Sequence, residues 1–284
     1  MKGSRLARLV RSGKVGGIEA QGSEARWLEP LNGRHVATNG TSTLDIRDSR
    51  DTEELSAAAR SIGRGLPGWV DRTLAAMALV VATPIMAAIA ILIRLDSPGP
   101  VIFRQWRLAQ DRRTGHGRTA SGERRTRSDL PGRPFLFYKF RTMRYDARTL
   151  YPELYAFEVS EEGFSSFYLQ MPNDPRVTRL GRFLRRTSLD ELPNLVNVLK
   201  RDMALVGPRP ELVEMGVYYR GLQRLKFRVK PGVTGMAQVM GRGDLSFADT
   251  VALDVEYVRK RSLLLDLKLL AKTLVETVRG SGAF

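Results

Sequence analysis

The feature that most constrains this chain is a run of 20 residues, Leu74–Ile93, that contains no charged side chain. As a helix this run would extend about 30 Å, the thickness of the hydrocarbon core of a bilayer. A helix of this length in a soluble core usually keeps one polar face, which this run lacks. The sequence therefore predicts a helix that enters a membrane, with a buried core helix as the alternative.

A Thr83-Pro84 pair lies near the middle of the run. Proline removes one backbone donor and its ring clashes with the preceding turn, so the helix is expected to bend there. The Thr83 hydroxyl is expected to bond a backbone group that Pro84 leaves free, which would lower the cost inside lipid.

Basic residues flank the run on both sides, and this bears on topology. Before it stand Arg60, Arg64 and Arg72, and after it stand Arg94, Arg104, Arg107, Arg112 and Arg113. The positive-inside rule assigns both flanks to the cytoplasm, which a bent helix that enters and leaves by one face satisfies. We therefore expect residues 67–96 to form a re-entrant helix, with a single span as the alternative because the rule is a bias.

The whole chain carries 46 Lys and Arg against 30 Asp and Glu, a formal charge of +16. Such a surplus favours anionic partners, namely nucleic acid, anionic lipid or phosphorylated substrates. The absence of cysteine excludes disulfides, thiol catalysis and thiolate metal sites. The two histidines, His35 and His116, are too few for a histidine-based zinc site and are expected at the surface.

The chain divides by composition into a tail and one larger domain. Residues 1–66 are polar and begin without the apolar region of a signal peptide, so we expect disorder there, or a short helix near residues 51–62. The domain at residues 67–284 comprises the membrane helix at 67–96, a basic Gly-rich loop at 108–134 and a core at 135–284. The loop lacks interleaved aromatic residues, so anionic headgroups suit it better than single-stranded nucleic acid.

The remaining pattern predicts a fold that is mainly α with a small β element, the α+β class. Strands are expected at residues 101–103, 135–140 and 237–240. Helices are expected at residues 176–187, 189–199, 212–225, 253–259 and 263–278. The last of these is apolar enough to lie either in the core or, as an amphipathic helix, in the plane of the membrane interface.

Two adjacent carboxylates, Asp190 and Glu191, open a predicted helix in a segment rich in cations. One explanation is structural, because Ser188 and Glu191 fit a capping box and acids favour the first turn of a helix. The other is a phosphate site with a divalent metal, since cations from several motifs accompany the pair. These cations are Lys139, Arg141, Arg185, Arg186, Arg209 and Arg242.

Taken together, these motifs resemble those of the monotopic polyprenyl-phosphate phosphoglycosyl transferases, the bacterial sugar transferase family. The matching segments follow the family order over roughly residues 68–280. They are Asp71-Arg72, Ser97-Pro-Gly-Pro-Val101, Lys139-Phe-Arg-Thr-Met143, Ser188-Leu-Asp-Glu-Leu-Pro193, Asn197-Val-Leu-Lys200, Asp202-Met-Ala-Leu-Val-Gly-Pro-Arg-Pro-Glu211, Lys230-Pro-Gly-Val-Thr-Gly235, Ala237-Gln-Val239, Gly241-Arg242, Asp254-Val-Glu-Tyr-Val258 and Asp266-Leu-Lys268.

The chain departs from this family pattern in a few places. It has Thr83-Pro84 where the family often has Ser-Pro, and its basic loop is longer than the family minimum. Residues 1–66 lie outside the match and are too short and polar to be the multi-span domain of larger relatives.

The resemblance implies a covalent mechanism with Asp190 as the nucleophile and Glu191 as the ligand of Mg²⁺. Lys139 and Arg185 would neutralise phosphate charge in the transition state. The resemblance further implies a substrate or phosphate-binding role for Arg141, Pro208, Arg209, Arg242, Asp254 and Asp266. For Asp254 and Asp266, an ordinary salt bridge is the equal alternative.

The same resemblance implies a substrate pair and a location. The donor would be a nucleotide sugar, a uridine diphosphate sugar by family habit, and the acceptor undecaprenyl phosphate, in the initiation of exopolysaccharide or capsule. The core would be catalytic and lie on the cytoplasmic face of the bacterial inner membrane, in contact with membrane lipids, and a homodimer is left open. The competing hypotheses are a nucleic-acid-binding protein, which Leu74–Ile93 and the lack of a reading motif disfavour, and a non-catalytic scaffold, which leaves Asp190-Glu191 and Gly207–Pro210 unexplained.

Overall fold

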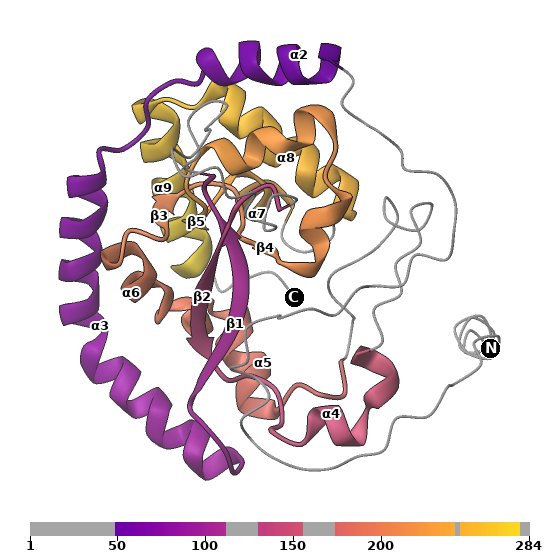
Figure 1. Cartoon of the computed structure of the whole chain (residues 1–284). Coiled ribbons are helices and arrows are strands. Elements are labelled where there is room, and N and C mark those ends of the chain that lie inside the picture. The colour runs from indigo at the N-terminus through magenta and orange to yellow at the C-terminus, as the bar shows by residue number, and fades with distance from the viewer. Residues whose placement is uncertain (1–48, 112–129, 156–173, 242–244, 279–284) are drawn as a thin grey trace, which may run out of the picture. The chain divides into compact units, whose positions relative to one another are not determined.

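The computed structural model describes residues 49–111, 130–155, 174–241 and 245–278 (Figure 1). Its α-helices are α2 (Ser49–Arg60), α3 (Gly68–Asp96), α4 (Ala147–Leu150), α5 (Arg179–Arg186), α6 (Asn194–Leu199), α7 (Met236–Gly241), α8 (Phe247–Lys260) and α9 (Leu263–Val278). Its 3₁₀ helices are η3 (Pro152–Tyr155), η4 (Leu189–Glu191), η5 (Glu214–Tyr218) and η6 (Gly221–Arg228). The strands are β1 (Ile102–Ala109), β2 (Arg133–Phe140), β3 (Ala204–Val206), β4 (Glu211–Leu212) and β5 (Gly232–Thr234).

This composition confirms a mainly helical α+β fold with a small β element. Several predicted features lie outside the described residues: the two histidines, Arg242, most of the N-terminal tail and most of the basic loop. The short helix expected near residues 51–62 is present as α2, which packs against η6. The predicted boundary between residues 66 and 67 stays a prediction.

Helix α3 is the long apolar element, 29 residues with a mean hydropathy of 2.6 in its most apolar window. Only 17% of that window is buried, so the alternative of a buried core helix is wrong. Figure 1 shows the helix bending part-way along its length, and Pro84 lies inside it. The Thr83 hydroxyl donates to the Leu79 carbonyl at 2.7 Å, and not to the Val80 carbonyl that Pro84 leaves without its usual donor. The expectation that Thr83 bonds a group freed by Pro84 is therefore wrong.

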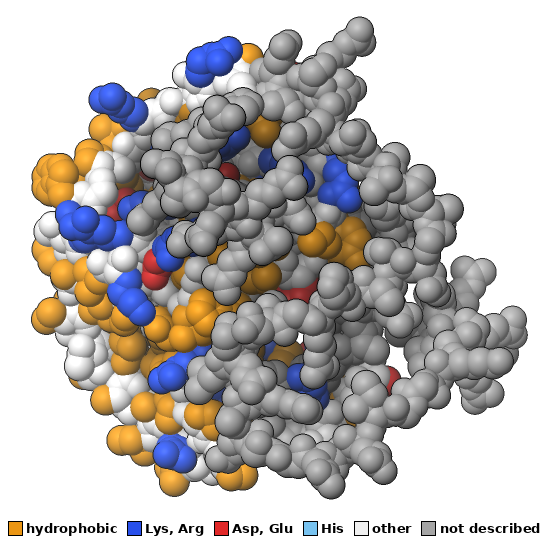
Figure 2. Space-filling model, in the orientation of Figure 1, with side chains coloured by type: hydrophobic (Ala, Val, Ile, Leu, Met, Phe, Trp, Pro, Cys, Tyr) orange, Lys and Arg blue, Asp and Glu red, His pale blue; other side chains and the backbone are white. Residues whose placement is uncertain are grey.

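A narrow stripe of α3 attaches it to the rest of the domain. The buried residues of the helix are Asp71, Ala75, Ala82, Ile89 and Ile93, which recur at helical spacing. The opposite faces leave large apolar side chains exposed, among them Val80 at 75% and Leu95 at 78%. Figure 2 shows hydrophobic side chains along the edge of the molecule that α3 forms. A helix that is held on one stripe and apolar elsewhere suits a lipid environment on its other faces.

Both ends of α3 are tied to the domain by buried polar groups. Near its start, the Asp71 carboxylate accepts a hydrogen bond from the Leu205 amide of β3 at 3.1 Å. At its end, Arg141 donates to the carbonyls of Ile93, Ser97 and Pro98 and to the Ser97 hydroxyl. Arg141 thereby joins the last turn of α3 to the two residues that follow it, in addition to the backbone bond from the Ser97 amide to the Ile93 carbonyl.

Two small sheets position the loops of the domain. Strands β1 and β2 form an antiparallel pair in which Ile102 faces Phe140 and Ala109 faces Arg133, and β4 pairs with the other edge of β1. Strands β3 and β5 pair in parallel. The parallel pair requires glycine at residue 232, because a Cβ there would stand 2.1 Å from the Gly207 amide nitrogen.

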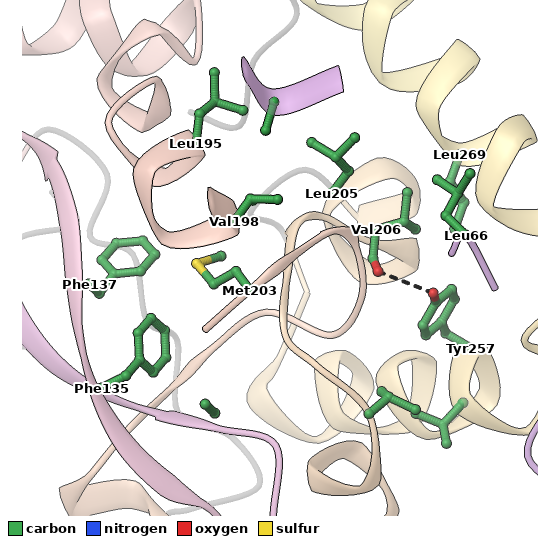
Figure 3. Close-up of a cluster of buried hydrophobic side chains, with 14 of the residues drawn as sticks. Leu66, Phe135, Phe137, Leu195, Val198, Met203, Leu205, Val206, Tyr257 and Leu269 are labelled. Carbon is green, nitrogen blue, oxygen red and sulfur yellow. Dashed lines mark hydrogen bonds between the residues drawn. The ribbon is translucent and has the colours of Figure 1, made fainter. Parts of the chain in front are cut away.

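The main hydrophobic core lies between these sheets and the C-terminal helices. Figure 3 shows Phe135 and Phe137 of β2 on one side, Val198 and Met203 next to them, and Tyr257 on the other side. The Tyr257 hydroxyl lies 3.3 Å from the Val206 carbonyl and donates to Asp266 at 2.7 Å.

The second oxygen of Asp266 accepts the Leu66 amide at 2.7 Å. Asp266 therefore joins α9 to α8 and to the segment before α3. These contacts give Asp266 a structural role, and they do not support the predicted phosphate-binding role.

Two predicted elements are wrong. Residues 212–225 do not form one helix but a short strand followed by η5 and η6, and a positive φ of 43° at Gly221 interrupts the helical path. Residues 237–240 are not a strand, since they belong to α7, where the Val239 amide donates to the Gly235 carbonyl. A short apolar run does not distinguish strand from helix by periodicity.

The other predicted elements are present. The helix expected at residues 189–199 is split into η4 and α6, on either side of Leu192 and Pro193. The expected strands at 101–103 and 135–140 are β1 and β2, and the expected helices at 176–187, 253–259 and 263–278 are α5, α8 and α9.

A buried ion network surrounds Lys226 of η6. Its amino group lies 3.1 Å from Asp254 and 3.2 Å from Glu211, and 3.0 Å from the Tyr219 hydroxyl. The side chains of Lys226 and Asp254 are at most 2% exposed. Burial raises the pKa of Asp254 to about 6, against the opposing effect of Lys226. Asp254 therefore forms an ordinary salt bridge, which was the alternative to the predicted phosphate-binding role. These contacts give no support to that role.

We predict that Lys226→Met lowers the apparent melting temperature of the detergent-solubilised protein by about 10 °C. The change would leave two buried carboxylates without their cation, a loss of about 3–5 kcal/mol. The matched control is Lys260→Met, because Lys260 pairs with Glu256 at the surface of α8 and its side chain is 67% exposed. Equal shifts for the two variants in thermal unfolding would contradict this account of the network.

Candidate active site

The two adjacent carboxylates lie on η4, between α5 and α6. Asp190 is buried, with 6% of its surface exposed, whereas Glu191 is half-buried. Ser188 precedes them in the left-handed region, with φ at 55°, and its side chain makes no capping hydrogen bond. The capping-box explanation of Ser188 and Glu191 is therefore wrong. The backbone at Ser188 instead turns the chain so that Asp190 points inward.

Lys139 reaches Asp190 from the end of β2. Its amino nitrogen lies 4.0 Å from an Asp190 carboxylate oxygen and 5.7 Å from the centre of the Phe103 ring on β1. Burial lowers the pKa of Lys139 to about 8, although Asp190 acts in the opposite direction. Lys139 is thus a partly desolvated cation held beside the carboxylate.

Burial also controls the charge of Asp190. It raises the pKa of the Asp190 carboxyl to about 6, and the negative charge of Glu191 acts in the same direction. Lys139, Arg185 and Arg209 oppose this rise. At neutral pH the carboxyl is ionised and desolvated, which is the state that a nucleophilic carboxylate requires.

Arg185 lies in the last turn of α5 and faces the same site. Its Nε donates to the Thr142 hydroxyl at 2.9 Å, which holds the guanidinium against the segment that follows β2. Burial lowers the pKa of Arg185, and Asp190 is the main influence in the other direction. Arg185 remains protonated, because the guanidinium pKa starts far above neutral pH.

Arg209 comes from the loop between β3 and β4. Its guanidinium donates to a Glu191 carboxylate oxygen at 3.1 Å, and the charge of Glu191 raises the pKa of Arg209. The loop is fixed by backbone bonds, since the Gly207 amide donates to Thr234 and the buried Pro208 carbonyl accepts from the Gly232 amide, each at 2.9 Å. Pro208 therefore shapes the loop that directs Arg209.

Arg107 of β1 is a member of this group that we considered only as part of a basic flank. Its guanidinium donates to the Pro210 carbonyl at 2.9 Å and supports the loop that carries Arg209. Burial lowers the pKa of Arg107 to about 10, and the nearby charge of Arg209 adds to the effect. Nothing in the local sequence marks Arg107 apart from other arginines, because its position depends on the pairing of β1 with β4.

The structure thus brings together five of the predicted site residues and separates others. Those brought together are Asp190, Glu191, Lys139, Arg185 and Arg209. Arg141 lies instead at the end of α3, Asp254 in the Lys226 network and Asp266 in the core. Arg242 falls outside the described residues.

The fit of a divalent metal can be judged from the donors present. Within the described part of the chain, no cluster of three or more His, Cys, Asp or Glu residues could hold a metal ion. Asp190 and Glu191 supply at most two carboxylates, which suits Mg²⁺, because this ion keeps several waters and takes further ligands from substrate phosphates. The residues therefore fit a metal that arrives with a phosphorylated substrate.

Comparison with known proteins identifies the family. Residues 64–280 match the family model described as bacterial sugar transferase. The chain belongs to this family. The sequence resemblance described above is therefore confirmed.

Three similar proteins illustrate the family. The galactosyl transferase CpsE of Streptococcus agalactiae is 35% identical over 76% of this chain and 42% of its own length. The UDP-glucose:undecaprenyl-phosphate glucose-1-phosphate transferase of Escherichia coli K12 is 34% identical over 89% of this chain and 47% of its length. The exopolysaccharide production protein ExoY of Rhizobium meliloti is 32% identical over 81% of this chain and 93% of its length. The chain thus spans less than half the length of the first two relatives.

The backbone at residue 188 gives a test of the site geometry. We predict that Ser188→Gly raises the apparent melting temperature by about 2–4 °C, because glycine adopts the left-handed conformation without the cost of roughly 1 kcal/mol that other residues carry. The comparison variant is Thr178→Gly, at the start of α5, where the hydroxyl does accept the Gly181 amide at 2.9 Å. Thr178→Gly should lower the melting temperature. A melting temperature for Ser188→Gly below that of the unmodified protein would contradict this prediction and support a capping role for Ser188.

Proposed function

We propose that this protein transfers a sugar 1-phosphate from a uridine diphosphate sugar to undecaprenyl phosphate, through a covalent intermediate on Asp190. The observation that carries the proposal is the position of Asp190, which is buried and surrounded by Lys139, Arg185 and Arg209. A helix cap would not need these cations, whereas an attack on phosphate would. The names of the relatives, which include undecaprenyl-phosphate sugar-phosphate transferases, support the same reaction.

In the first step, a carboxylate oxygen of Asp190 attacks the β-phosphorus of the donor. The bond between this phosphorus and the bridging oxygen breaks, so that uridine monophosphate leaves with the electron pair. An acyl phosphate that carries the sugar remains on Asp190. In the second step, a phosphate oxygen of undecaprenyl phosphate attacks the same phosphorus, and the Asp190 carboxylate is released with its electron pair.

The cations of the site have separate tasks in this scheme. Lys139 and Arg185 flank Asp190 and would neutralise the charge that spreads over the phosphoryl oxygens in both steps. Arg209 is held by Glu191 in the substrate-free structure and would bind a donor phosphate. Two steps keep the two anionic substrates from having to occupy the site together.

Magnesium completes the proposed site. Glu191 would hold Mg²⁺ together with donor phosphate oxygens, and the ion would supply charge neutralisation at the diphosphate. Glu191 is half-buried and adjacent to Asp190, so it can reach a phosphate positioned for attack.

We also propose that α3 is a re-entrant membrane helix and that the site lies on the cytoplasmic face of the bacterial inner membrane. The exposed apolar faces of α3 and its bend support membrane insertion. Helix α9 leaves Leu263, Leu264, Leu267 and Leu274 exposed, which suits an amphipathic helix at the interface. The product would initiate exopolysaccharide or capsule assembly. The names of related proteins include both glucose and galactose, so we propose a sugar 1-phosphate without specifying the sugar.

We expect Asp190→Asn to abolish both uridine monophosphate release and lipid-linked product, with a loss of at least about 10⁴-fold, because the amide cannot form the acyl phosphate. Both products are measured with membranes and a panel of uridine diphosphate sugars. Asp249→Asn on α8 is the matched control, since Asp249 is exposed and pairs only with Ser246 among the described contacts. Retained turnover in Asp190→Asn would remove Asp190 as the nucleophile.

Topology is tested by single cysteines, which need no background substitutions because the chain has none. Arg64→Cys and Arg104→Cys place exposed thiols before and after α3. We expect an impermeant thiol reagent to label both only from the cytoplasmic side, as a re-entrant helix requires. Labelling of the two positions from opposite sides would mean a true span, and labelling in detergent controls for reactivity.

A further inference from the structure

A pocket of about 450 Å³ lies where α3 ends and α5 begins. This volume is in the range of small-molecule sites. Its wall is built by the end of α3, the segment after β2 and the start of α5. The charged residues and the serine that line it are Asp96, Ser97, Arg144, Asp146, Arg179 and Arg182.

Some of the charged side chains of this pocket pair with one another, whereas others do not. Arg144 and Asp146 neutralise one another through two hydrogen bonds, at 3.0 and 2.9 Å. The Arg179 side chain makes no hydrogen bond or ion pair with another described residue, and Arg182 donates only one long bond, 3.3 Å to the Val177 carbonyl. Two guanidinium groups of the pocket are therefore available to an anion.

Other features of the pocket favour the same kind of ligand. Thr178, the N-cap of α5, and Arg179, its first residue, both line the pocket, so the positive end of the α5 dipole lies at the pocket wall. The remaining acid, Asp96, lies in the field of the Arg141 guanidinium: burial lowers the pKa of Arg141, and the charge of Asp96 opposes this effect. The balance left for a ligand is cationic, which suits a phosphate group.

The pocket is separate from the Asp190 group and close to the membrane helix. Arg179 and Arg185 are about 9 Å apart along the axis of α5, so the pocket and the catalytic carboxylate lie at opposite ends of this helix. Leu95 is 78% exposed and is followed directly by Asp96 in the pocket wall. An apolar surface thus adjoins a cationic pocket, as a lipid with a phosphate headgroup would require.

We propose that this pocket binds the phosphate headgroup of a membrane lipid, with Arg179 and Arg182 as its main contacts and the acyl or prenyl chain along the last turns of α3. The proposal rests on the membrane placement of α3 within the proposed function. Two sources provide this chemistry: an anionic phospholipid that anchors the domain, and undecaprenyl phosphate before it reaches Asp190. The arginines would act in the same way on either.

The test compares charge removal in the pocket with charge removal elsewhere, in the full-length protein. The pocket variant is Arg179→Gln with Arg182→Gln, and the control is Arg259→Gln with Lys260→Gln at the end of α8, which also removes two exposed cations. Native mass spectrometry of the detergent-solubilised protein, titrated with phosphatidylglycerol, reports phospholipid affinity without turnover. The KM for undecaprenyl phosphate, measured beside uridine monophosphate release, reports acceptor binding.

We expect about tenfold weaker binding of one of the two lipids in the pocket variant, and unchanged monophosphate release when undecaprenyl phosphate is saturating. A loss confined to phosphatidylglycerol identifies an anchoring phospholipid, whereas a raised KM for undecaprenyl phosphate identifies the acceptor. Arg179→Lys with Arg182→Lys should restore part of the affinity, because it keeps the charge. Arg179→Gln alone serves if loss of the Arg182 contact weakens folding.

Affinities for both lipids within about twofold of the α8 control would overturn the proposal. This result is distinct from failure of the proposed function, because phosphatidylglycerol titration requires no reaction. A wild-type protein that turns over but shows no pocket dependence would refute only the lipid site. A protein that binds phosphatidylglycerol through Arg179 and Arg182 but does not release uridine monophosphate would refute only the transferase proposal.

Discussion

The constraint on which this structure depends is the desolvation of one negative charge. Removing the Asp190 carboxylate from water is unfavourable unless cations compensate for it. The compensating groups come from three separate segments: Lys139 from β2, Arg185 from α5 and Arg209 from the loop after β3. Each segment must be in place before the carboxylate is balanced. The site is therefore a point where the β1–β2 hairpin, the short helices and the parallel strand pair are held to one another.

Helix α3 is connected to the same segments at both of its ends. Asp71 accepts the Leu205 amide of β3, and the loop that follows β3 carries Arg209 to Glu191. Arg141, which binds the Ile93 carbonyl of α3 and the Ser97 carbonyl just beyond the helix, is only two residues beyond Lys139. The contacts that attach α3 are thus also those that orient two cations of the site. This continuity explains why a charged residue, Asp71, occurs on the otherwise apolar buried stripe of α3, since its carboxylate reaches strand β3.

The sequence was sufficient for features that depend on long, regular patterns or on charge, and insufficient for those set by tertiary contacts. The uncharged run predicted α3, the apolar period predicted α9, and the adjacent acids with their cations predicted the Asp190 group. The helix expected at residues 212–225 failed because the extended backbone at Tyr219 and Arg220 and the positive φ of Gly221 separate η5 from η6. Arg141 and Arg107 could not be assigned correctly, since one arginine in a motif resembles another until the strand pairing is known. Ser188 and Glu191 match the sequence pattern of a capping box, but the left-handed backbone at Ser188 does not allow the capping hydrogen bond to form.

The clamp that Arg141 forms on the end of α3 has a geometric consequence. In the proposed reaction, a soluble donor and a lipid-borne acceptor would meet only at one height above the bilayer, so the protein would have to present Asp190 at that height. Arg141 binds the end of α3, and Lys139, two residues before it at the end of β2, lies 4.0 Å from Asp190. If α3 inserts into the membrane as proposed, its depth would therefore set the height of Asp190. A bilayer of different thickness would then shift the helix and Asp190 together, so that the proposed activity would respond to membrane thickness.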